Sequence, residues 1–194
     1  MEIRVAKTAG FCFGVRRAVE LTYGLLAEGR RVATLGPLIH NPQAVEDLRK
    51  KGALVADSPA DVPAGYEVVI RSHGVPHSVY DELTERKIPY HDATCPFVQK
   101  IQRIAAEAEK AGAVLLVAGD KTHPEVQGIV GHTRGEVFVF ADLAELKAWK
   151  GPSDPQKTLF AVAQTTFQVT KWQESSEFLK KAYTNARIFD TICN

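Results

Sequence analysis

The chain has 194 residues, of which 45% are hydrophobic and 24% charged, and its formal net charge is +1 at pH 7. This length suits one large or two small domains, and the near-neutral charge excludes a bulk electrostatic case for nucleic acid or an acidic membrane. No apolar run approaches the roughly 18 residues of a transmembrane helix, and the N-terminus lacks the apolar region of a signal peptide. We therefore expect a cytoplasmic location, or an organelle stroma if a transit peptide has been removed.

The first half of the chain alternates strand-like and helix-like segments. Apolar residues recur at helical spacing after Gly14, and Pro42 suits the first turn of a short helix. The expected elements are a strand over 2–7, a helix over 14–28, a strand over 32–35, a helix over 42–50, a strand over 67–70, a helix through Tyr80 and Leu83, and a strand over 88–91.

The same order begins again after Cys95. The small and branched apolar residues of 113–118 indicate a strand that is buried on both faces. Alternation of this kind predicts parallel sheets covered by helices, with ligands at the carboxyl ends of the strands. The expected elements are helices over 96–111, 125–131, 142–149 (capped by Asp142) and 168–181, and strands over 113–118, 136–140, 159–163 and 187–189.

The spacing of cysteine and histidine indicates a repeated unit. His40 follows Cys12 by 28 residues, and His123 follows Cys95 by the same 28. In both stretches a glycine precedes the histidine by four residues and a proline follows closely. An aspartate also stands three residues before Cys95 and again before Cys193. The spacing therefore predicts tandem repeated units of the same α/β design.

The repeat also predicts domain boundaries. We expect a first α/β unit over 1–94, in which 1–12 belong with a further unit, and a second unit over 95–192. Residues 193–194 would open a third unit. We therefore expect this chain to be a fragment or a truncated product that holds two of three units.

The three cysteines indicate a metal site. Their number is odd and they lie far apart, which argues against a disulfide framework and fits a reducing compartment. Free cysteines are often small buried hydrophobes, but Gly, Pro, Thr and Asp flank these three, as in loops. Thiolates select zinc, copper(I) or iron–sulfur clusters, and the lack of closely spaced cysteines weakens the case for zinc. A cluster held by three cysteines would leave one iron open to a substrate oxygen.

Polar residues follow several of the predicted strands. Imidazoles there can donate hydrogen bonds to an anion such as a phosphate or diphosphate, with help from nearby helix N-termini. Glu125 could pass protons in such a pocket, although an ordinary first-turn helix acid is the alternative interpretation. The candidate residues at strand ends are His40, His73, His123, Thr165 and Thr166. The residues interpreted as capping or core histidines are His77, His91 and His132.

Seven motifs together resemble the LytB/IspH family, 4-hydroxy-3-methylbut-2-enyl diphosphate reductase. Family members catalyse the last step of the non-mevalonate isoprenoid pathway. The motifs span the whole chain in the family's order, and as a set they are highly specific. They are AGFCFGV at 9–15, GPLIHNP at 36–42, RSHGV at 71–75, DATCP at 92–96, THPEV at 122–126, QTT at 164–166 and DTIC at 190–193.

The resemblance implies a trefoil of three α/β units about a pseudo-threefold axis, with a [4Fe–4S] cluster at its centre. The implied reaction is reductive removal of an allylic hydroxyl, using two electrons and two protons, to give isopentenyl and dimethylallyl diphosphates. Ferredoxin or flavodoxin is the implied electron donor, and the enzyme class is oxidoreductase.

The resemblance also implies roles for single residues. Glu125 looks like the proton donor, and one of Thr165 and Thr166 would contact the substrate hydroxyl, with Thr165 favoured. The implied iron ligands are Cys12, Cys95 and Cys193, and the implied diphosphate and substrate contacts are His40, His73 and His123.

One departure from the family leaves alternatives open. Family members continue past the third cysteine into a third unit, which supplies a Ser-x-Asn motif to the diphosphate pocket. The alternatives for this chain are an inactive fragment of the reductase, a non-enzymatic iron–sulfur or zinc-binding module, and a metal-free α/β module with inert cysteines.

Overall fold

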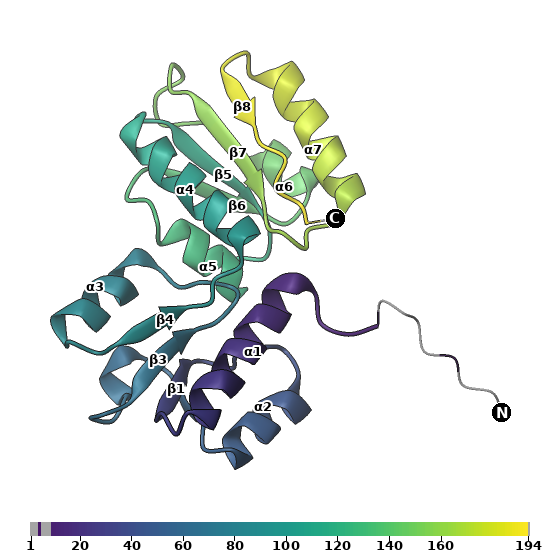
Figure 1. The fold of residues 1–194 in the computed structure, drawn as a ribbon. Coiled ribbons are helices and arrows are strands. Elements are labelled where there is room, and N and C mark those ends of the chain that lie inside the picture. The colour runs from purple at the N-terminus through teal and green to yellow at the C-terminus, as the bar shows by residue number, and fades with distance from the viewer. Residues whose placement is uncertain (1–3, 5–8, 194) are drawn as a thin grey trace. The chain divides into compact units, whose positions relative to one another are not determined.

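The computed structural model describes Arg4 and residues 9–193 (Figure 1). The strand expected over 2–7 lies outside the described residues, apart from Arg4. The described chain divides into two compact units. Unit 1 contains residues up to Ser72 and Arg86–Cys95, and unit 2 contains His73–Glu85 and the residues from Pro96 onward. No helix among the described residues is both long enough and apolar enough to cross a membrane.

Unit 1 is built on a four-stranded parallel sheet in the order β2-β1-β3-β4. Its core joins helices α1 and α2 to strands β1 and β3 through buried residues such as Ala18, Leu48, Val32 and Val69. The elements of its chain segments are α1 (Phe13–Ala27), β1 (Val32–Leu35), α2 (Pro42–Lys50), β2 (Leu54–Ala56), the 3₁₀ helix η1 (Pro59–Asp61), β3 (Glu67–Ile70) and β4 (Tyr90–Asp92).

Unit 2 repeats this design with a parallel sheet in the order β6-β5-β7-β8. The equal strand order confirms the prediction of tandem parallel α/β units. Helix α3 (His77–Glu85) lies between β3 and β4 in the sequence but belongs to unit 2 by its contacts. The other elements are α4 (Pro96–Lys110), β5 (Val114–Ala118), α5 (Pro124–Val130), β6 (Val137–Phe140), α6 (Leu143–Ala148), β7 (Leu159–Ala163), α7 (Val169–Ala182) and β8 (Ala186–Ile188).

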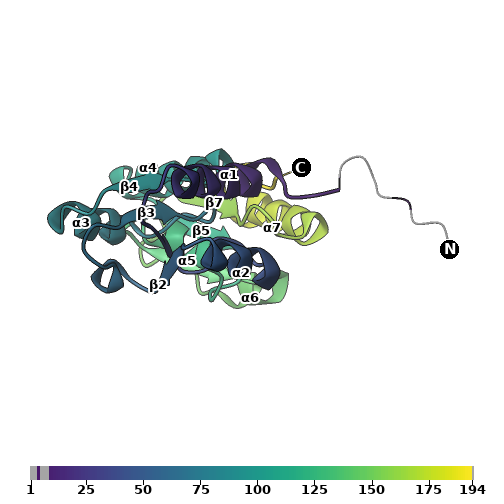
Figure 2. The same cartoon turned by 60° about the horizontal axis from the view of Figure 1, so that its bottom comes forward.

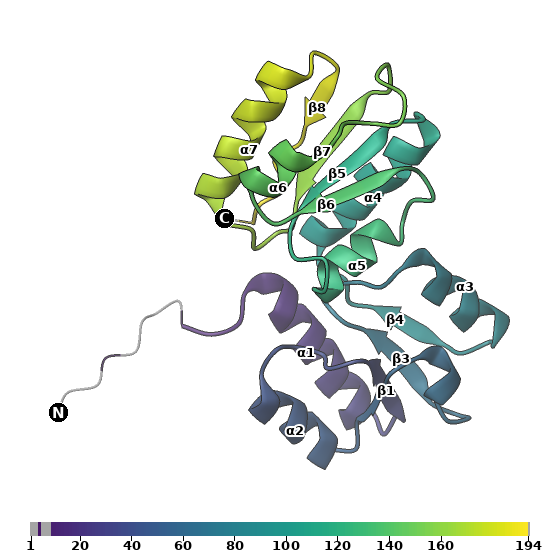
Figure 3. The same cartoon turned by 180° about the vertical axis from the view of Figure 1, so that it is seen from behind.

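Helices cover both faces of the sheet in unit 2. Leu115 and Val117 of β5 pack in one core cluster with residues of α4 and α5, whereas the intervening Leu116 packs with residues of α6 and α7. Figure 2 shows α4 and α6 on opposite sides of β5, and the view from behind in Figure 3 brings α6 to the front. Strand β5 is therefore buried on both faces, as its composition predicts.

The sequence pattern missed β2 and η1. Strand β2 has three residues with intermediate, exposed and buried side chains, so it offers neither an apolar run nor a clear alternation. The remaining expected elements in the described residues are present, with ends shifted by a few residues, and Asp142 caps α6 as predicted by accepting the N–H of Glu145. End positions shift because capping, rather than hydrophobic spacing, decides where a helix begins.

The same hydrogen bonds occur at the ends of the strands in both units. The N–H of Cys95 donates to the carbonyl oxygen of Ser72 at 3.0 Å, and the N–H of Cys193 donates to that of Thr165 at 2.8 Å. Ser72 and Thr165 each stand two residues beyond an inner strand of their sheet, β3 and β7 respectively. The repeat therefore extends to the backbone partner of each cysteine.

Thr191 secures the segment that carries Cys193. Its buried hydroxyl accepts the N–H of Ala163 at 2.8 Å and lies 2.8 Å from the carbonyl oxygen of the same residue, to which it donates. In unit 1 the corresponding carbonyl, that of Ile70, accepts the N–H of Ala93 instead. A side chain in unit 2 thus replaces a backbone contact of unit 1.

We expect Thr191→Val to destabilise the chain, because it leaves the buried N–H and carbonyl of Ala163 without a partner. The free energy of unfolding should fall by about 1–3 kcal/mol in urea titrations. Thr170→Val, at an exposed position of α7, is the matched control and should change stability by about 0.5 kcal/mol or less. An equal, small effect of both substitutions would contradict the role given to Thr191.

Candidate functional site

Unit 1 presents Cys12 and Cys95 at the beginnings of helices. Cys12 is the N-cap residue of α1, and its side chain makes no capping hydrogen bond, so the sulfur is not used by the helix. Cys95 directly precedes α4. A Cβ atom at Gly14 would lie 2.6 Å from the sulfur of Cys95 and 2.9 Å from its Cβ. Because Gly14 has no side chain, Cys95 can pack against the first turn of α1.

Arg17 ties α1 to the turn that carries Cys95. Its guanidinium donates to the carbonyl oxygen of Thr94 at 3.0 Å and to that of Asp92 at 3.2 Å. The carboxylate of Asp92 in turn accepts the N–H of Thr94 at 2.9 Å. These bonds fix the backbone immediately before Cys95 relative to the helix that begins after Cys12.

His40 is exposed and lies between β1 and α2. The next residue, Asn41, caps α2 by accepting the N–H of Ala44 at 3.0 Å. The N-terminus of α2 therefore begins directly after the imidazole. A helix N-terminus favours nearby negative charge, so an anion at His40 would gain from both groups.

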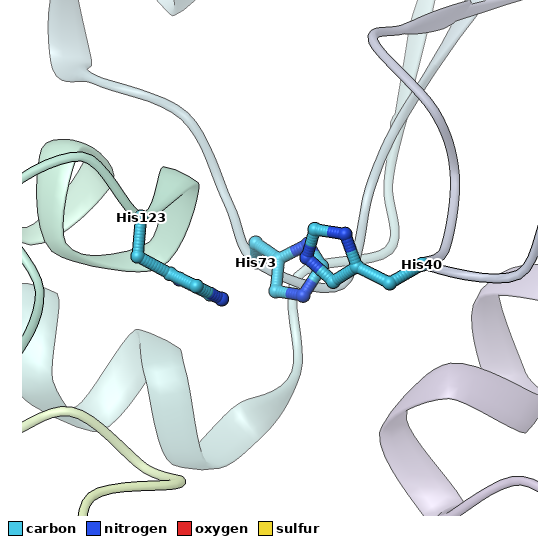
Figure 4. A group of neighbouring side chains, drawn as sticks. All are labelled: His40, His73 and His123. Carbon is cyan, nitrogen blue, oxygen red and sulfur yellow. The ribbon is translucent and has the colours of Figure 1, made fainter.

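Unit 2 brings His73 and His123 together. Their ring centroids are 5.3 Å apart and their planes meet edge to face at 85°. Figure 4 draws these two side chains together with that of His40 from unit 1. His123 is the N-cap of α5, and its Nδ1 accepts the N–H of Glu125 at 3.1 Å. In the neutral ring this bond assigns the proton to Nε2.

A close backbone contact positions His73. A Cβ atom at Gly128 of α5 would lie 3.4 Å from the carbonyl oxygen of His73. The N–H of His77 donates to the carbonyl oxygen of Gly131, and a ring nitrogen of His132 lies 3.1 Å from the carbonyl oxygen of Val75. Helix α5 therefore carries His123 and holds the segment after His73 as well.

Glu125 and Thr165 form the buried centre of unit 2. Glu125 is 2% exposed. Its Oε1 accepts the N–H of Thr165 at 2.6 Å, and its Oε2 accepts the Thr165 hydroxyl at 2.8 Å. The carbonyl of the same threonine accepts the N–H of Cys193. Thr165 thus connects a carboxyl group to a cysteine through its own backbone and hydroxyl.

Burial determines the acidity of Glu125. Loss of hydration raises the pKa of this carboxyl above its ordinary value of 4.5, and this outweighs the lowering by the N–H and hydroxyl of Thr165. A carboxyl with a raised pKa retains its proton closer to neutral pH and can act as a general acid. An ordinary first-turn helix acid is solvated, so the burial of Glu125 disfavours that interpretation.

The structure separates the two threonines. Thr165 is buried against Glu125, whereas Thr166 is exposed and its hydroxyl accepts the side-chain amide of Gln164 at 3.2 Å. Unit 2 collects His73, His123, Glu125, Thr165 and Cys193, and unit 1 carries Cys12, Cys95 and His40. The site roles of all these residues remain predictions.

Sequence reasoning missed the residues that position the cysteines. Gly14, Arg17 and Thr191 touch the cysteine-bearing segments but carry no motif of their own for metal binding or catalysis. A signal was present for Arg17, because an arginine one turn after a cysteine at a helix start can reach a neighbouring turn. No signal in the sequence shows that Gly14 faces a sulfur.

The model of the family described as LytB protein matches residues 3–194. The chain belongs to the LytB protein family. A relative from Syntrophotalea carbinolica, named 4-hydroxy-3-methylbut-2-enyl diphosphate reductase, is 42% identical over 195 residues, which cover all of this chain and 68% of the relative. The chain thus spans about two thirds of that relative's length.

Solved structures show the same fold. The structure of an (E)-4-hydroxy-3-methyl-but-2-enyl diphosphate reductase, titled as the terminal enzyme of the non-mevalonate pathway, matches with a TM-score of 0.84 and 34% identity. That match covers 99% of this chain and 68% of the other. The E-1-hydroxy-2-methyl-but-2-enyl-4-diphosphate reductase from Plasmodium falciparum matches with a TM-score of 0.86 and 25% identity, over 96% of this chain and 59% of the other.

We expect Gly14→Ala to displace Cys95, although alanine is the better helix former by about 1 kcal/mol. The new methyl group would overlap the sulfur, so the free energy of unfolding should fall by about 1–3 kcal/mol and the Cys95 thiol should react faster with a thiol reagent. Gly24→Ala in the same helix is the control, since a Cβ there meets nothing within 4 Å and should stabilise the chain. A gain in stability from both substitutions would refute the contact.

Glu125 should make stability depend on pH. Because its pKa is raised in the folded chain, the folded state binds more protons than the unfolded state between about pH 4.5 and the raised pKa. Stability contributed by this group is therefore lost as the pH rises through that window. Glu125→Gln should flatten the decline in urea unfolding measured from about pH 4 to pH 8. An unchanged slope would contradict the raised pKa.

Proposed function

We propose that this chain supplies the cluster ligands, anion-binding imidazoles and proton donor of a 4-hydroxy-3-methylbut-2-enyl diphosphate reductase. The observation that carries this proposal is the buried Glu125–Thr165 pair, whose threonine carbonyl also accepts the N–H of Cys193. A proton donor adjoins a thiol-bearing segment there, as reductive removal of a hydroxyl requires. Family membership and the names of the relatives support the same activity.

The cysteines fit an iron–sulfur cluster. None of the three, all within the described residues, is in a disulfide, and Cys12 and Cys193 are exposed while Cys95 is partly so. The sulfur of Cys12 takes no part in capping, and Gly14 leaves room for that of Cys95. When bound, a three-cysteine [4Fe–4S] cluster supplies electrons and a Lewis-acidic iron.

The remaining residues bind substrate and deliver a proton. Glu125, with its raised pKa, holds a proton that the Thr165 hydroxyl can pass to a leaving hydroxyl group. His123 and His73, whose rings adjoin in unit 2, are proposed to bind an anionic group of the substrate, and His40 is proposed as a further substrate contact. The substrate class is an allylic diphosphate, and the two electrons come from a low-potential carrier of the ferredoxin or flavodoxin type.

Cluster assembly and turnover test this proposal in one preparation. The chain is incubated with iron and sulfide without oxygen, its iron, sulfide and visible absorbance are measured, and reduction of the allylic diphosphate is then assayed with a low-potential donor. Glu125→Gln should lower turnover by about a hundredfold or more while the absorbance of the cluster is unchanged. The control is Glu145→Gln, at an exposed acid in the first turn of α6, which should retain turnover.

Each alternative function gives a different result. Zinc bound without sulfide would favour a zinc-binding module, and a cluster without turnover would favour a non-enzymatic iron–sulfur module or an inactive fragment. A colourless chain that binds no iron would exclude the proposed function for this chain.

A further inference from the structure

The internal repeat allows Arg71 to be compared with its counterpart in unit 2. Arg71 follows β3 by one residue and precedes Ser72, the partner of the Cys95 N–H. Gln164 follows β7 by one residue and precedes Thr165, the partner of the Cys193 N–H. The two side chains therefore occupy the same position in two copies of one backbone.

Both side chains lie against a glycine that ends the neighbouring strand. A Cβ at Gly36, whose φ is +69°, would lie 2.4 Å from Nη1 of Arg71. A Cβ at Gly119 would lie 3.0 Å from Oε1 of Gln164. Gly36 and Gly119 are themselves equivalent, because their N–H groups donate to the carbonyl oxygens that end β2 and β6. The packing against glycine is thus shared, and it does not require a charge.

The polar contacts of the two side chains differ. Gln164 accepts the N–H of Asp120 at 3.2 Å and donates to the hydroxyl of Thr166 at 3.2 Å. Arg71 is partly exposed, its Nε–H is buried without a hydrogen-bond partner, and no carboxylate pairs with its guanidinium in the part of the chain that the structure describes. A neutral, hydrogen-bonded side chain in unit 2 thus corresponds in unit 1 to a charged one whose Nε–H has no partner.

The buried Nε–H of Arg71 is a donor without a partner. Burial lowers the pKa of Arg71, yet an arginine remains protonated at neutral pH, so the donor cannot be removed by deprotonation. Buried donors in proteins are nearly always hydrogen-bonded, because a donor without a partner destabilises the fold. Glutamine meets the structural need at the equivalent position, so the charge of Arg71 requires another explanation.

We propose that Arg71 is an anion-binding residue of unit 1 and that its ligand is a phosphate or diphosphate group. The guanidinium lies against the glycine that opens the loop to His40, at the carboxyl end of the sheet where parallel folds bind ligands. A planar guanidinium pairs with phosphate oxygens through two parallel hydrogen bonds. That this anion is the diphosphate end of the substrate rests on the proposed function.

The test uses inorganic diphosphate and the cluster-free chain. Binding is measured by calorimetry, and the melting temperature is measured with and without diphosphate at constant ionic strength. Arg71→Gln installs the residue found at the equivalent place in unit 2, and Arg49→Gln, on an exposed part of α2, removes the same charge elsewhere in unit 1.

Arg71→Gln should weaken diphosphate binding by about tenfold to a hundredfold, whereas Arg49→Gln should change it by less than about twofold. Without diphosphate, Arg71→Gln should melt at or above the temperature of the unaltered chain, because a buried donor without a partner has been removed. An arginine with a purely structural role would give the opposite, a lower melting temperature with unchanged binding.

Two results would overturn the proposal: no diphosphate binding by the unaltered chain, or equal binding by Arg71→Gln. If Arg71→Gln does not fold, the Nε–H resonance of Arg71 in the unaltered chain decides, since diphosphate must shift it. If only the proposed reductase function is wrong, the chain would still bind diphosphate through Arg71 but would form no cluster or show no turnover.

Discussion

The hydrogen bond from a cysteine N–H to a carbonyl just beyond an inner strand of the sheet is the constraint on which the site depends. It occurs once in each unit, from Cys95 to Ser72 and from Cys193 to Thr165. A parallel strand ends with unpaired backbone groups, and these bonds use one of them to hold a thiol at the carboxyl edge. The end of each sheet therefore determines where the backbone of Cys95 and that of Cys193 lie.

The two units share this backbone frame and differ in the side chains attached to it. Where unit 1 has Arg71, a charge without a described partner, unit 2 has Gln164, a satisfied amide. Where unit 2 buries Glu125 against Thr165, the corresponding helix of unit 1 begins with an asparagine cap. The same backbone frame thus carries different polar side chains in the two units, since side chains at strand ends can change without disturbing the core.

Much of the fold follows from the sequence, because strand and helix alternation depends on burial patterns that are visible in the residues. The repeat was also visible, since the spacing of Cys12 and His40 equals that of Cys95 and His123. Contacts between segments far apart in the sequence could not be predicted. They are the packing of Cys95 against Gly14, the hydrogen bond from Arg17 to the carbonyl of Thr94, and the hydrogen bond between Thr191 and the backbone of Ala163. These depend on side-chain direction in the folded chain, which local patterns do not encode.

Hydrogen exchange at the amides of Cys95 and Cys193 tests the central constraint most directly. Both amides can be followed by NMR in the cluster-free chain. If the strand-end carbonyls of Ser72 and Thr165 hold them, both should exchange slowly, at rates comparable to those of amides within the two sheets. Exchange of either amide at the rate of an unstructured peptide would show that its thiol is not held by the fold, and would contradict the account.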